Sequence, residues 1–326
     1  MTRHLALPLG LLVAALFGLM AGHDWMGPAR LWQALSGEAS LQGGLILYWR
    51  LPRVLAAGLV GALLGSGGAI FQGVFRNPLA EPYLLGTAGG GAVGATIALL
   101  LPTGLPPGLA LAGLSFVGAW GATWAVLLVA RLAGGFDTAA LLLAGVSIAA
   151  ILQAIRSGMM LALSDESVSL QVVLSWTLGG IQTPGWGGLA LLAGLAALGL
   201  LLAQRLHRGL DLLGLGDEQA NAFGLDTVRF TRLAVLSGAL VVAIAVAWGG
   251  LVAFIGLVAP HLARWTVGPR HGALLPVSAA YGAMLVMLCD GVARAALPPA
   301  EIPLGLITAL VGGPFFLFVL ARRARR

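Results

Sequence analysis

The sequence predicts an all-α polytopic membrane protein with about ten transmembrane helices. Of its 326 residues, 59% are hydrophobic and 9% are charged, and the mean hydropathy is +0.97. A soluble domain carries about 25% charged residues to cover its surface, so this composition excludes a soluble fold. The apolar stretches are continuous and do not alternate with polar residues, which excludes a transmembrane β-barrel.

Ten apolar stretches are expected to form transmembrane helices, since about 20 residues of helix cross the hydrocarbon core of a bilayer. Charges, prolines and turn residues set the expected boundaries at 5–22, 51–71, 84–101, 108–131, 139–161, 186–204, 230–247, 250–264, 273–293 and 303–321. A further apolar stretch at 172–181 is too short to span and is expected to form a half-helix or a re-entrant segment. The whole chain, 1–326, is therefore expected to be a single transmembrane domain.

The distribution of arginine predicts the orientation. An even number of spans leaves both termini on one side, and the C-terminal sequence ARRARR places that side in the cytoplasm by the positive-inside rule. All 18 basic residues are arginine, and thirteen then fall on the cytoplasmic side: Arg3, Arg76, Arg131, Arg205, Arg208, Arg229, Arg232, Arg264, Arg270, Arg322, Arg323, Arg325 and Arg326. Such arginines report orientation, so the basic charge is not attributed to nucleic-acid binding. In the outer connection at 23–49, Trp25 and Trp32 suit a helix lying on the membrane lipid.

The sequence offers no residue set for catalysis or for holding a metal. The five histidines are scattered singly, and Cys289 is the only cysteine, which excludes an internal disulfide and a cysteine-based metal site. Without lysine there is no phosphate-binding loop of the form G-x-x-x-x-G-K-[ST]. We therefore expect a chain that is not an enzyme and binds no cofactor. An ion-gradient-driven secondary transporter is the alternative, and it would depend on Asp290, the acidic residue nearest to the interior of a span.

The most polar stretch, 205–229, is expected to be a cytoplasmic loop containing a short helix. Within it, GLGDEQANAFGLD from Gly214 to Asp226 begins the helix with Asp217 in the N-cap position and closes it with Gly224. If Ala220 and Ala222 face outward, this helix can dock into a groove on a partner. From the residues alone, a solvated loop is an equally good interpretation.

Six motifs in this order resemble those of the permease subunits of type II ABC importers for vitamin B12, iron siderophores and haem. They are RLPR at 50–53, FRNPLAEPYLLG at 75–86, LLLAG at 141–145, LGLGDEQANAFGLD at 213–226, AFIGLVAPHLAR at 253–264 and AEIPLGLITALVGGPFF at 300–316. The resemblance covers nearly the whole chain. It implies the type II permease fold, in a bacterial inner membrane, with inward transport of a siderophore, haem or cobalamin.

The same resemblance implies partners. Two copies of the chain would form a homodimer around one central path. Two cytoplasmic ATPase subunits would hold ATP and Mg, so hydrolysis would occur on a separate chain. A periplasmic or extracellular substrate-binding protein would deliver the substrate.

The resemblance also implies roles for individual residues. The coupling helix that contacts the ATPase falls on Gly216, Asp217, Glu218, Ala220 and Gly224. Docking of the binding protein falls on Arg50, Arg53 and Arg294, for which snorkelling to lipid headgroups is the alternative. The cytoplasmic gate falls on Asn77, Leu79, Asp137 and Thr138, and a turn-stabilising role is the alternative for Asn77.

Arg156 is an unusual charge within a predicted span. It lies about 24 Å along a helix that starts near the cytoplasm, which places it near the outer leaflet. It is expected either to snorkel or to line the mouth of the path, where it could meet a carboxylate of an anionic chelate. Met159 is expected to line the same path.

Overall fold

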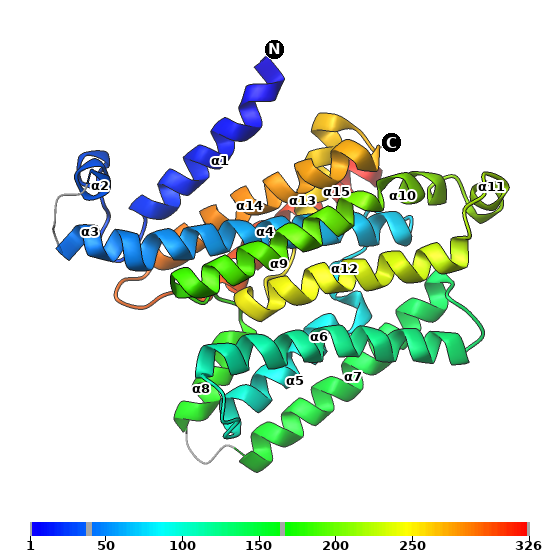
Figure 1. The fold of residues 1–326 in the computed structure, drawn as a ribbon, viewed down its shortest axis with the longest axis horizontal. Helices are drawn as coiled ribbons and strands as arrows, with labels where there is room; N and C mark the ends of the chain where they lie inside the picture. The colour runs from blue at the N-terminus through cyan, green and yellow to red at the C-terminus, as the bar shows by residue number, and fades with distance from the viewer. Residues whose placement is uncertain (1, 37–40, 164–166, 325–326) are drawn as a thin grey trace.

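The computed structural model describes residues 2–36, 41–163 and 167–324, which fold mainly into helices (Figure 1). In chain order the elements are α1 (Thr2–Met20), α2 (Pro28–Leu35), α3 (Leu41–Leu45), the π-helix η1 (Ile46–Arg50), α4 (Leu51–Val74), the 3-10 helix η2 (Pro82–Leu85), α5 (Thr87–Leu100), α6 (Pro107–Leu132), α7 (Thr138–Leu163), α8 (Ser167–Thr177), α9 (Gly185–Arg205), α10 (His207–Leu213), α11 (Asp217–Ala222), α12 (Thr227–Gly249), α13 (Ile255–Val267), α14 (His271–Ala295) and α15 (Leu304–Ala324).

The predicted class of polytopic helical membrane protein is confirmed. In the described part of the chain, seven helices are long and apolar enough to cross a membrane, and Ala6–Met20 and Thr87–Leu100 are shorter apolar helices. The expected span at 250–264 differs, because residues 250–254 are not helical and α13 has 13 residues. Thirteen residues of helix rise about 20 Å, less than the hydrocarbon core of about 30 Å.

Two runs of four helices have the same plan and opposite directions (Figure 1). The first run is α4 to α7 and the second is α12 to α15. Each begins with a long α-helix, which is followed by a break and a short α-helix, and ends with two long α-helices; the break of the first run contains η2. This is an inverted repeat, an arrangement common in transporters. It had not been identified in the sequence.

Helix α4 lies at the centre of the bundle. It packs mainly on α14, α12, α13 and α9, and 78% of an apolar 18-residue stretch of the continuous span 43–74, to which α4 belongs, is buried. Glycines allow this packing: a Cβ added to Gly61 would lie 2.2 Å from the Gly282 carbonyl oxygen. Small residues let helix backbones touch in this way within lipid, where association depends on close packing.

The segment after α8 joins the ends of two distant helices. Helix α8 confirms a short helix near 172–181, although it ends at Thr177 and the chain continues as non-helical backbone. There the N–H of Gly180 donates to the Gly249 carbonyl oxygen at 3.0 Å, and the N–H of Leu304 donates to the Gly179 carbonyl oxygen at 2.9 Å. The C-terminus of α12 and the N-terminus of α15 thereby receive partners for backbone groups that lipid cannot satisfy.

Replacing Gly61 with alanine is expected to lower the free energy of unfolding by about 1–3 kcal/mol, because the new methyl group would press on the backbone of α14. The measurement is thermal unfolding of the purified chain in detergent. Gly121→Ala, on α6 with no heavy atom within 4 Å of the added Cβ, is the matched control. The control should be unchanged or stabilised, because alanine favours helix over glycine by up to about 1 kcal/mol. Equal unfolding temperatures for the two variants would contradict the tight α4–α14 contact.

Candidate functional site

The loop predicted to couple to an ATPase lies at one end of the bundle, opposite α2 and α3 (Figure 1). It consists of α10 and α11. Gly216, with a φ of +106°, is the N-cap of α11, so the prediction that Asp217 caps the helix is wrong: Asp217 is the first helical residue. Gly224, with a φ of +84°, directly follows the helical C-cap Phe223. Left-handed backbone there suits glycine, which agrees with its predicted closing role.

The exposed surface of this loop differs from the expected one. Ala220 is fully buried, so the prediction that it faces outward is wrong, whereas Ala222 is exposed. Glu218 is exposed, and the two large apolar side chains Leu215 and Phe223 are 51% and 69% exposed. Sequence reasoning missed these two residues, although apolar side chains in the most polar loop of the chain were a usable signal. Exposed apolar groups of this kind are typical of a surface that a partner covers.

Side chains attach the loop to the bundle at two places. Asp211 of α10 accepts hydrogen bonds from the N–H and the Nδ1 of His271 at 2.9 and 2.7 Å, which caps the start of α14. Asp217 of α11 accepts a hydrogen bond from Nη2 of Arg76, just after α4. The loop is thus bonded to the ends of two long helices.

The predicted gate residues belong to the segment after α4 and to the start of α7, and these segments lie at the same end of the bundle as this loop (Figure 1). The Oδ1 of Asn77 accepts the Leu79 N–H at 3.0 Å, which confirms the turn-stabilising role of Asn77. The Oδ1 of Asp137 accepts the Ala140 N–H at 2.9 Å, so Asp137 caps α7, whose first residue is Thr138. Asn77, Asp137 and Thr138 are exposed and Leu79 is half-buried, and a gating role stays a prediction for all four.

At the opposite end, two of the predicted docking arginines bind the C-terminus of α1. Nη1 and Nη2 of Arg294 donate to the carbonyl oxygens of Ala21 and Gly18 at 2.5 and 2.7 Å. Arg50 donates to the carbonyl oxygens of Leu19 and Asp24 at 3.1 and 3.0 Å. The last carbonyls of a helix have no partner within the helix, and a cation near them is also favoured by the helix dipole.

The third predicted docking arginine, Arg53, lies between two carboxylates. It donates to Oδ1 of Asp290 through Nε and Nη2, both at 3.1 Å, and to both carboxylate oxygens of Glu301 at 3.1 and 2.9 Å. Asp290 also accepts Nε of Arg294 at 2.9 Å, and its side chain is 1% exposed. The result is a buried ion-pair cluster of Arg53, Asp290 and Arg294, with Glu301 at its edge.

This cluster bears on the docking prediction. The Arg294 side chain is 5% exposed, so in this conformation it is not accessible to a docked protein and its contacts are structural. The alternative of snorkelling to lipid is also wrong for Arg294, because a snorkelling group is exposed at the interface. Arg53 is 18% exposed, and Glu301 is 52% exposed beside it. Docking stays a prediction for the three arginines.

A junction in the interior joins the two helix breaks. The N–H of Phe254, which has a φ of +66°, donates to Oε1 of Glu81 at 3.0 Å. Tyr83 Oη donates to the Val252 carbonyl oxygen and accepts the Val252 N–H, both at 3.1 Å. Burial raises the pKa of the Glu81 carboxyl above its ordinary value of 4.5, although the Phe254 N–H opposes the shift in part. Sequence reasoning missed Glu81, because no local pattern identifies its distant partner.

Arg156 is buried under α8. It is 6% exposed, and its Nη2 donates to Oγ1 of Thr177 at 2.6 Å. The expectation that it snorkels to lipid headgroups is therefore wrong. Met159 is half-buried on the same helix. In this conformation Arg156 does not face an open surface, and lining the path stays a prediction for both residues.

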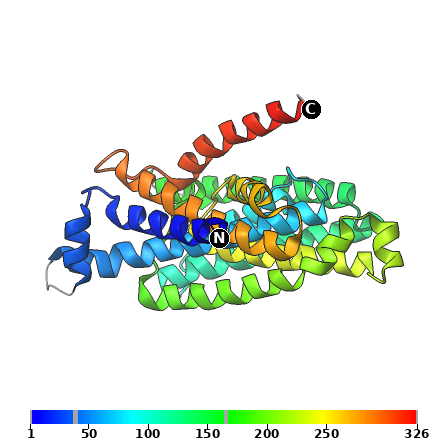
Figure 2. The same cartoon turned by 90° about the horizontal axis from the view of Figure 1, so that it is seen from above.

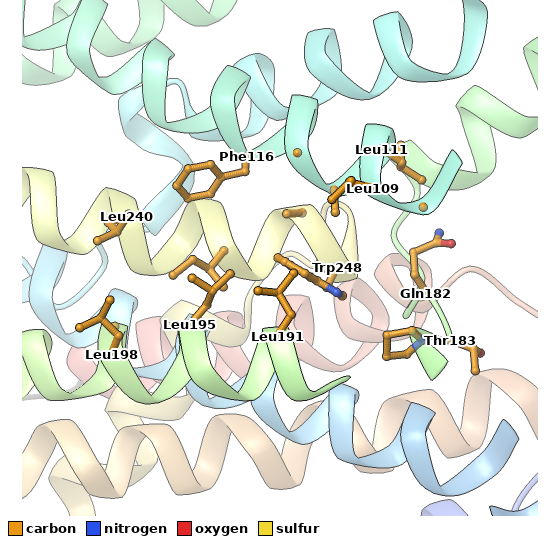
Figure 3. Close-up of a pocket in the computed structure, with 17 residues that line it drawn as sticks. Leu109, Leu111, Phe116, Gln182, Thr183, Leu191, Leu195, Leu198, Leu240 and Trp248 are labelled. Carbon is orange, nitrogen blue, oxygen red and sulfur yellow. The ribbon is translucent and has the colours of Figure 1, made fainter. Parts of the chain in front are cut away.

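An apolar cavity of about 420 Å³ lies between α6, α9 and α12 (Figure 3). Leu198 and Leu240 lie at one end of it, and Gln182 and Thr183 lie at the other. In the part of the chain that the structure describes, its lining includes no charged side chain. Burial of a carboxylate there without a partner would be strongly unfavourable, so this cavity does not fit an anionic chelate. Among the residues that the structure describes, no group of three His, Cys, Asp or Glu side chains is placed to hold a metal ion.

Replacing Asp290 with asparagine is expected to lower the free energy of unfolding by about 3–5 kcal/mol, because the buried Arg294 would lose its carboxylate partner and Arg53 would keep only Glu301. Chemical unfolding of the purified chain in detergent measures the change. Glu301→Gln is the control, since an ion pair with a partner that is 52% exposed contributes about 1 kcal/mol or less. An Asp290→Asn variant as stable as the wild type would contradict the cluster as a structural element.

The raised pKa of the Glu81 carboxyl predicts that the stability of the folded chain depends on pH. An acid whose pKa is raised on folding stabilises the folded chain below its unfolded pKa, and this contribution is lost as the pH rises through the folded pKa. Glu81→Gln should therefore match the wild type below pH 4.5 and be more stable than it above the raised pKa, since the amide oxygen can still accept the Phe254 N–H. Glu81→Ala leaves that N–H unpaired and should be about 1–3 kcal/mol less stable than Glu81→Gln at every pH, since neither variant titrates at this position. Thermal unfolding against pH tests this, and identical pH profiles for the wild type and Glu81→Gln would refute it.

Comparison with known proteins agrees with this architecture. Residues 10–322 match the model of the FecCD transport family. The chain is 37% identical over 323 residues to the hemin transport system permease protein HmuU of Yersinia pestis, covering 97% of this chain and 96% of that protein. It is also 37% identical over 323 residues to the vitamin B12 import system permease protein BtuC of Salmonella typhi, covering 98% and 95%.

A solved structure supports the same assignment. An inward-facing metal-chelate type ABC transporter superposes with a TM-score of 0.84 at 30% sequence identity, covering 98% of each chain. The family match, the near-complete coverage of both relatives and the shared helical architecture lead to one conclusion: the chain belongs to the FecCD transport family.

Proposed function

We propose that the chain is the membrane permease subunit of a binding-protein-dependent ABC importer. The observation that carries the proposal is the loop of α10 and α11, which combines exposed apolar side chains, at Leu215 and Phe223, with side-chain bonds to the ends of α4 and α14. Such a loop can bind a cytoplasmic partner and pass its movement to the long helices. ATP and Mg would be held by that partner, and Gly216, Asp217, Glu218, Ala220 and Gly224 would form the coupling segment.

A second copy of the chain would complete the transport path. Only 17% of an apolar 18-residue stretch of α7 is buried inside the structure. This is the smallest share among the seven candidate spans of the described residues. Its exposed residues include the small side chains of Ser147, Ala150, Ala154 and Ser157, which recur at the spacing of one helix face. Small residues of this kind suit a helix interface within lipid. Figure 2 shows α15 diverging from the bundle, which leaves a further surface for a partner.

The orientation follows from the same loop. We place α10 and α11 in the cytoplasm and α2 and α3 on the outer side, with both termini cytoplasmic, in a bacterial inner membrane. The positive-inside rule supports this placement, because the α10–α11 end carries most of the loop arginines. A periplasmic or extracellular binding protein would then dock near Arg50, Arg53 and Glu301.

The proposed substrates are an iron siderophore, haem or cobalamin, imported inward. The names of the relatives, a hemin permease and a vitamin B12 permease, support this range. The ion-gradient alternative loses its main support, since Asp290 is paired with Arg53 and Arg294 and is not free to exchange protons. Neutralising Asp290 would also disturb folding, so a transport defect in such a variant does not identify a coupling carboxylate.

Affinity purification of the tagged chain from its native membranes is the first test. In mild detergent, mass determination is expected to find two copies of this chain with two ATPase subunits. In vesicles, this particle should import hemin or cyanocobalamin only when ATP is supplied with the binding protein. A chain that purifies alone and drives uptake from an ion gradient would make the secondary transporter the correct function.

A pair of variants tests the loop within the same preparation. Phe223→Ala should weaken ATPase retention about 30-fold, since removing an anchor side chain from an interface costs about 2 kcal/mol or more. Leu233→Ala is the matched control, because Leu233 lies on α12 outside the loop and is 55% exposed. ATPase retained equally by the two variants would mean that Phe223 does not form the contact.

A further inference from the structure

An ion pair joins two segments to which we assign separate roles. Arg76 directly precedes the gate segment, residues 77–79, and Asp217 begins the coupling helix α11. Nη2 of Arg76 donates to Oδ1 of Asp217, 141 positions apart in the sequence. Apart from this bond, α11 packs mainly on α10 and α12, its neighbours along the chain. The pair therefore gives α11 a direct connection to the end of α4.

Arg76 lies in a turn whose geometry is tightly held. Its φ is +50°, a value uncommon outside glycine, and its N–H donates to the Gly73 carbonyl oxygen at 3.2 Å. The next N–H, that of Asn77, donates to the Gln72 carbonyl oxygen at 3.1 Å, and the Asn77 side chain accepts the Leu79 N–H. Because consecutive residues are bonded in this way, a displacement of the Arg76 side chain is expected to move residues 76–79 together.

The end of α4, from which this turn continues, is also bonded to α13. Nε2 of Gln72 donates to the Gly256 carbonyl oxygen at 3.3 Å, and Oε1 of Gln72 accepts a hydrogen bond from Arg264. Gly256 lies next to the junction at which Glu81 accepts the Phe254 N–H. The end of α4 that precedes Arg76 is therefore hydrogen-bonded to the start of α13, two residues from the junction with Glu81.

The partial exposure of this ion pair is consistent with a contact that becomes stronger when a partner binds. The side chains of Arg76 and Asp217 are 37% and 63% exposed. Exposed ion pairs contribute little to folding stability, so the fold does not depend on this one. A protein docked on α11 would exclude water from the pair, and the attraction between two charges grows as the effective dielectric constant falls.

We propose that Arg76 is a positioning residue, which transmits the displacement of α11 to the gate segment through its ion pair with Asp217. This inference rests on the proposed function, which assigns α11 to the ATPase and residues 77–79 to the gate. Since the link requires only opposite charges, exchanging the two charges should preserve it. Aspartate is suited to position 76, because Asp and Asn adopt positive φ more readily than other non-glycine residues.

The test measures the gate segment directly. Leu79→Cys is introduced together with Cys289→Ala, which removes the single native thiol, and the complex is purified with its ATPase. The reaction rate of position 79 with a membrane-impermeant maleimide is compared with and without Mg-ATP and vanadate. With the native pair, the rate should change about fivefold or more, the lower range of coupling between two sites. Arg76→Asp and Asp217→Arg should each abolish this change, and the double variant should restore it.

Arg229→Asp is the matched control for the charge reversal. Arg229, in the first turn of α12, pairs with Asp226 at 3.1 Å and is 89% exposed, so its reversal alters the charge near α11 without touching the connection to α4. This control should keep the full nucleotide response. A response that persists in both single reversals, or one that the double variant does not recover, overturns the proposal. Bound ATPase with no response in the native pair would overturn both the gate assignment and this link, whereas failure of any ATPase to bind would overturn the proposed function itself.

Discussion

The structure depends on one constraint: within a membrane, each backbone N–H and carbonyl group must find a partner inside the protein. Continuous helices meet this requirement on their own, but this chain interrupts its bundle between α4 and α5 and again between α12 and α13. The second break is satisfied by groups far away in sequence, since Glu81 and Tyr83 bind the backbone of Phe254 and Val252. The same requirement accounts for the position of the segment after α8, where the N–H of Gly180 donates to the Gly249 carbonyl oxygen at the end of α12. The hydrogen bonds between these two breaks therefore help to fix where the short helices α5 and α13 begin.

The two ends of the bundle satisfy their polar groups in different ways. At the α2–α3 end, Arg294 and Asp290 are buried, and each makes several bonds, so removal of one partner leaves a charge without compensation. At the α10–α11 end, the connection between Arg76 and Asp217 is a single, partly exposed pair. The first end is thus held by buried charges. At the other end, Asp211 bonds α10 to the start of α14, whereas the link from α11 to α4 can change at little cost in folding stability.

Hydropathy located most of the helices, because it is a local property that follows the chain. The short helix before residue 181 and the left-handed turn at Gly224 were also accessible, since length and glycine placement are local. The break at 250–254 was not, because its sequence GLVAF is as apolar as a helix and its interruption is compensated by Glu81. The burial of Ala220 was missed for a related reason: in a six-residue helix, composition does not reveal which face packs on the protein.

By itself, the sequence determined that the chain crosses the membrane as helices, where its polar connections fall, and which family motifs it carries in order. These properties depend on runs of neighbouring residues. Only the tertiary structure decided that Arg294 is buried against α1, that Arg156 lies beneath α8, and that Arg53 shares Asp290 across 237 positions of sequence. The physical reason is that the environment of a charged side chain is set by its partners, and a single sequence does not state which distant residues become partners.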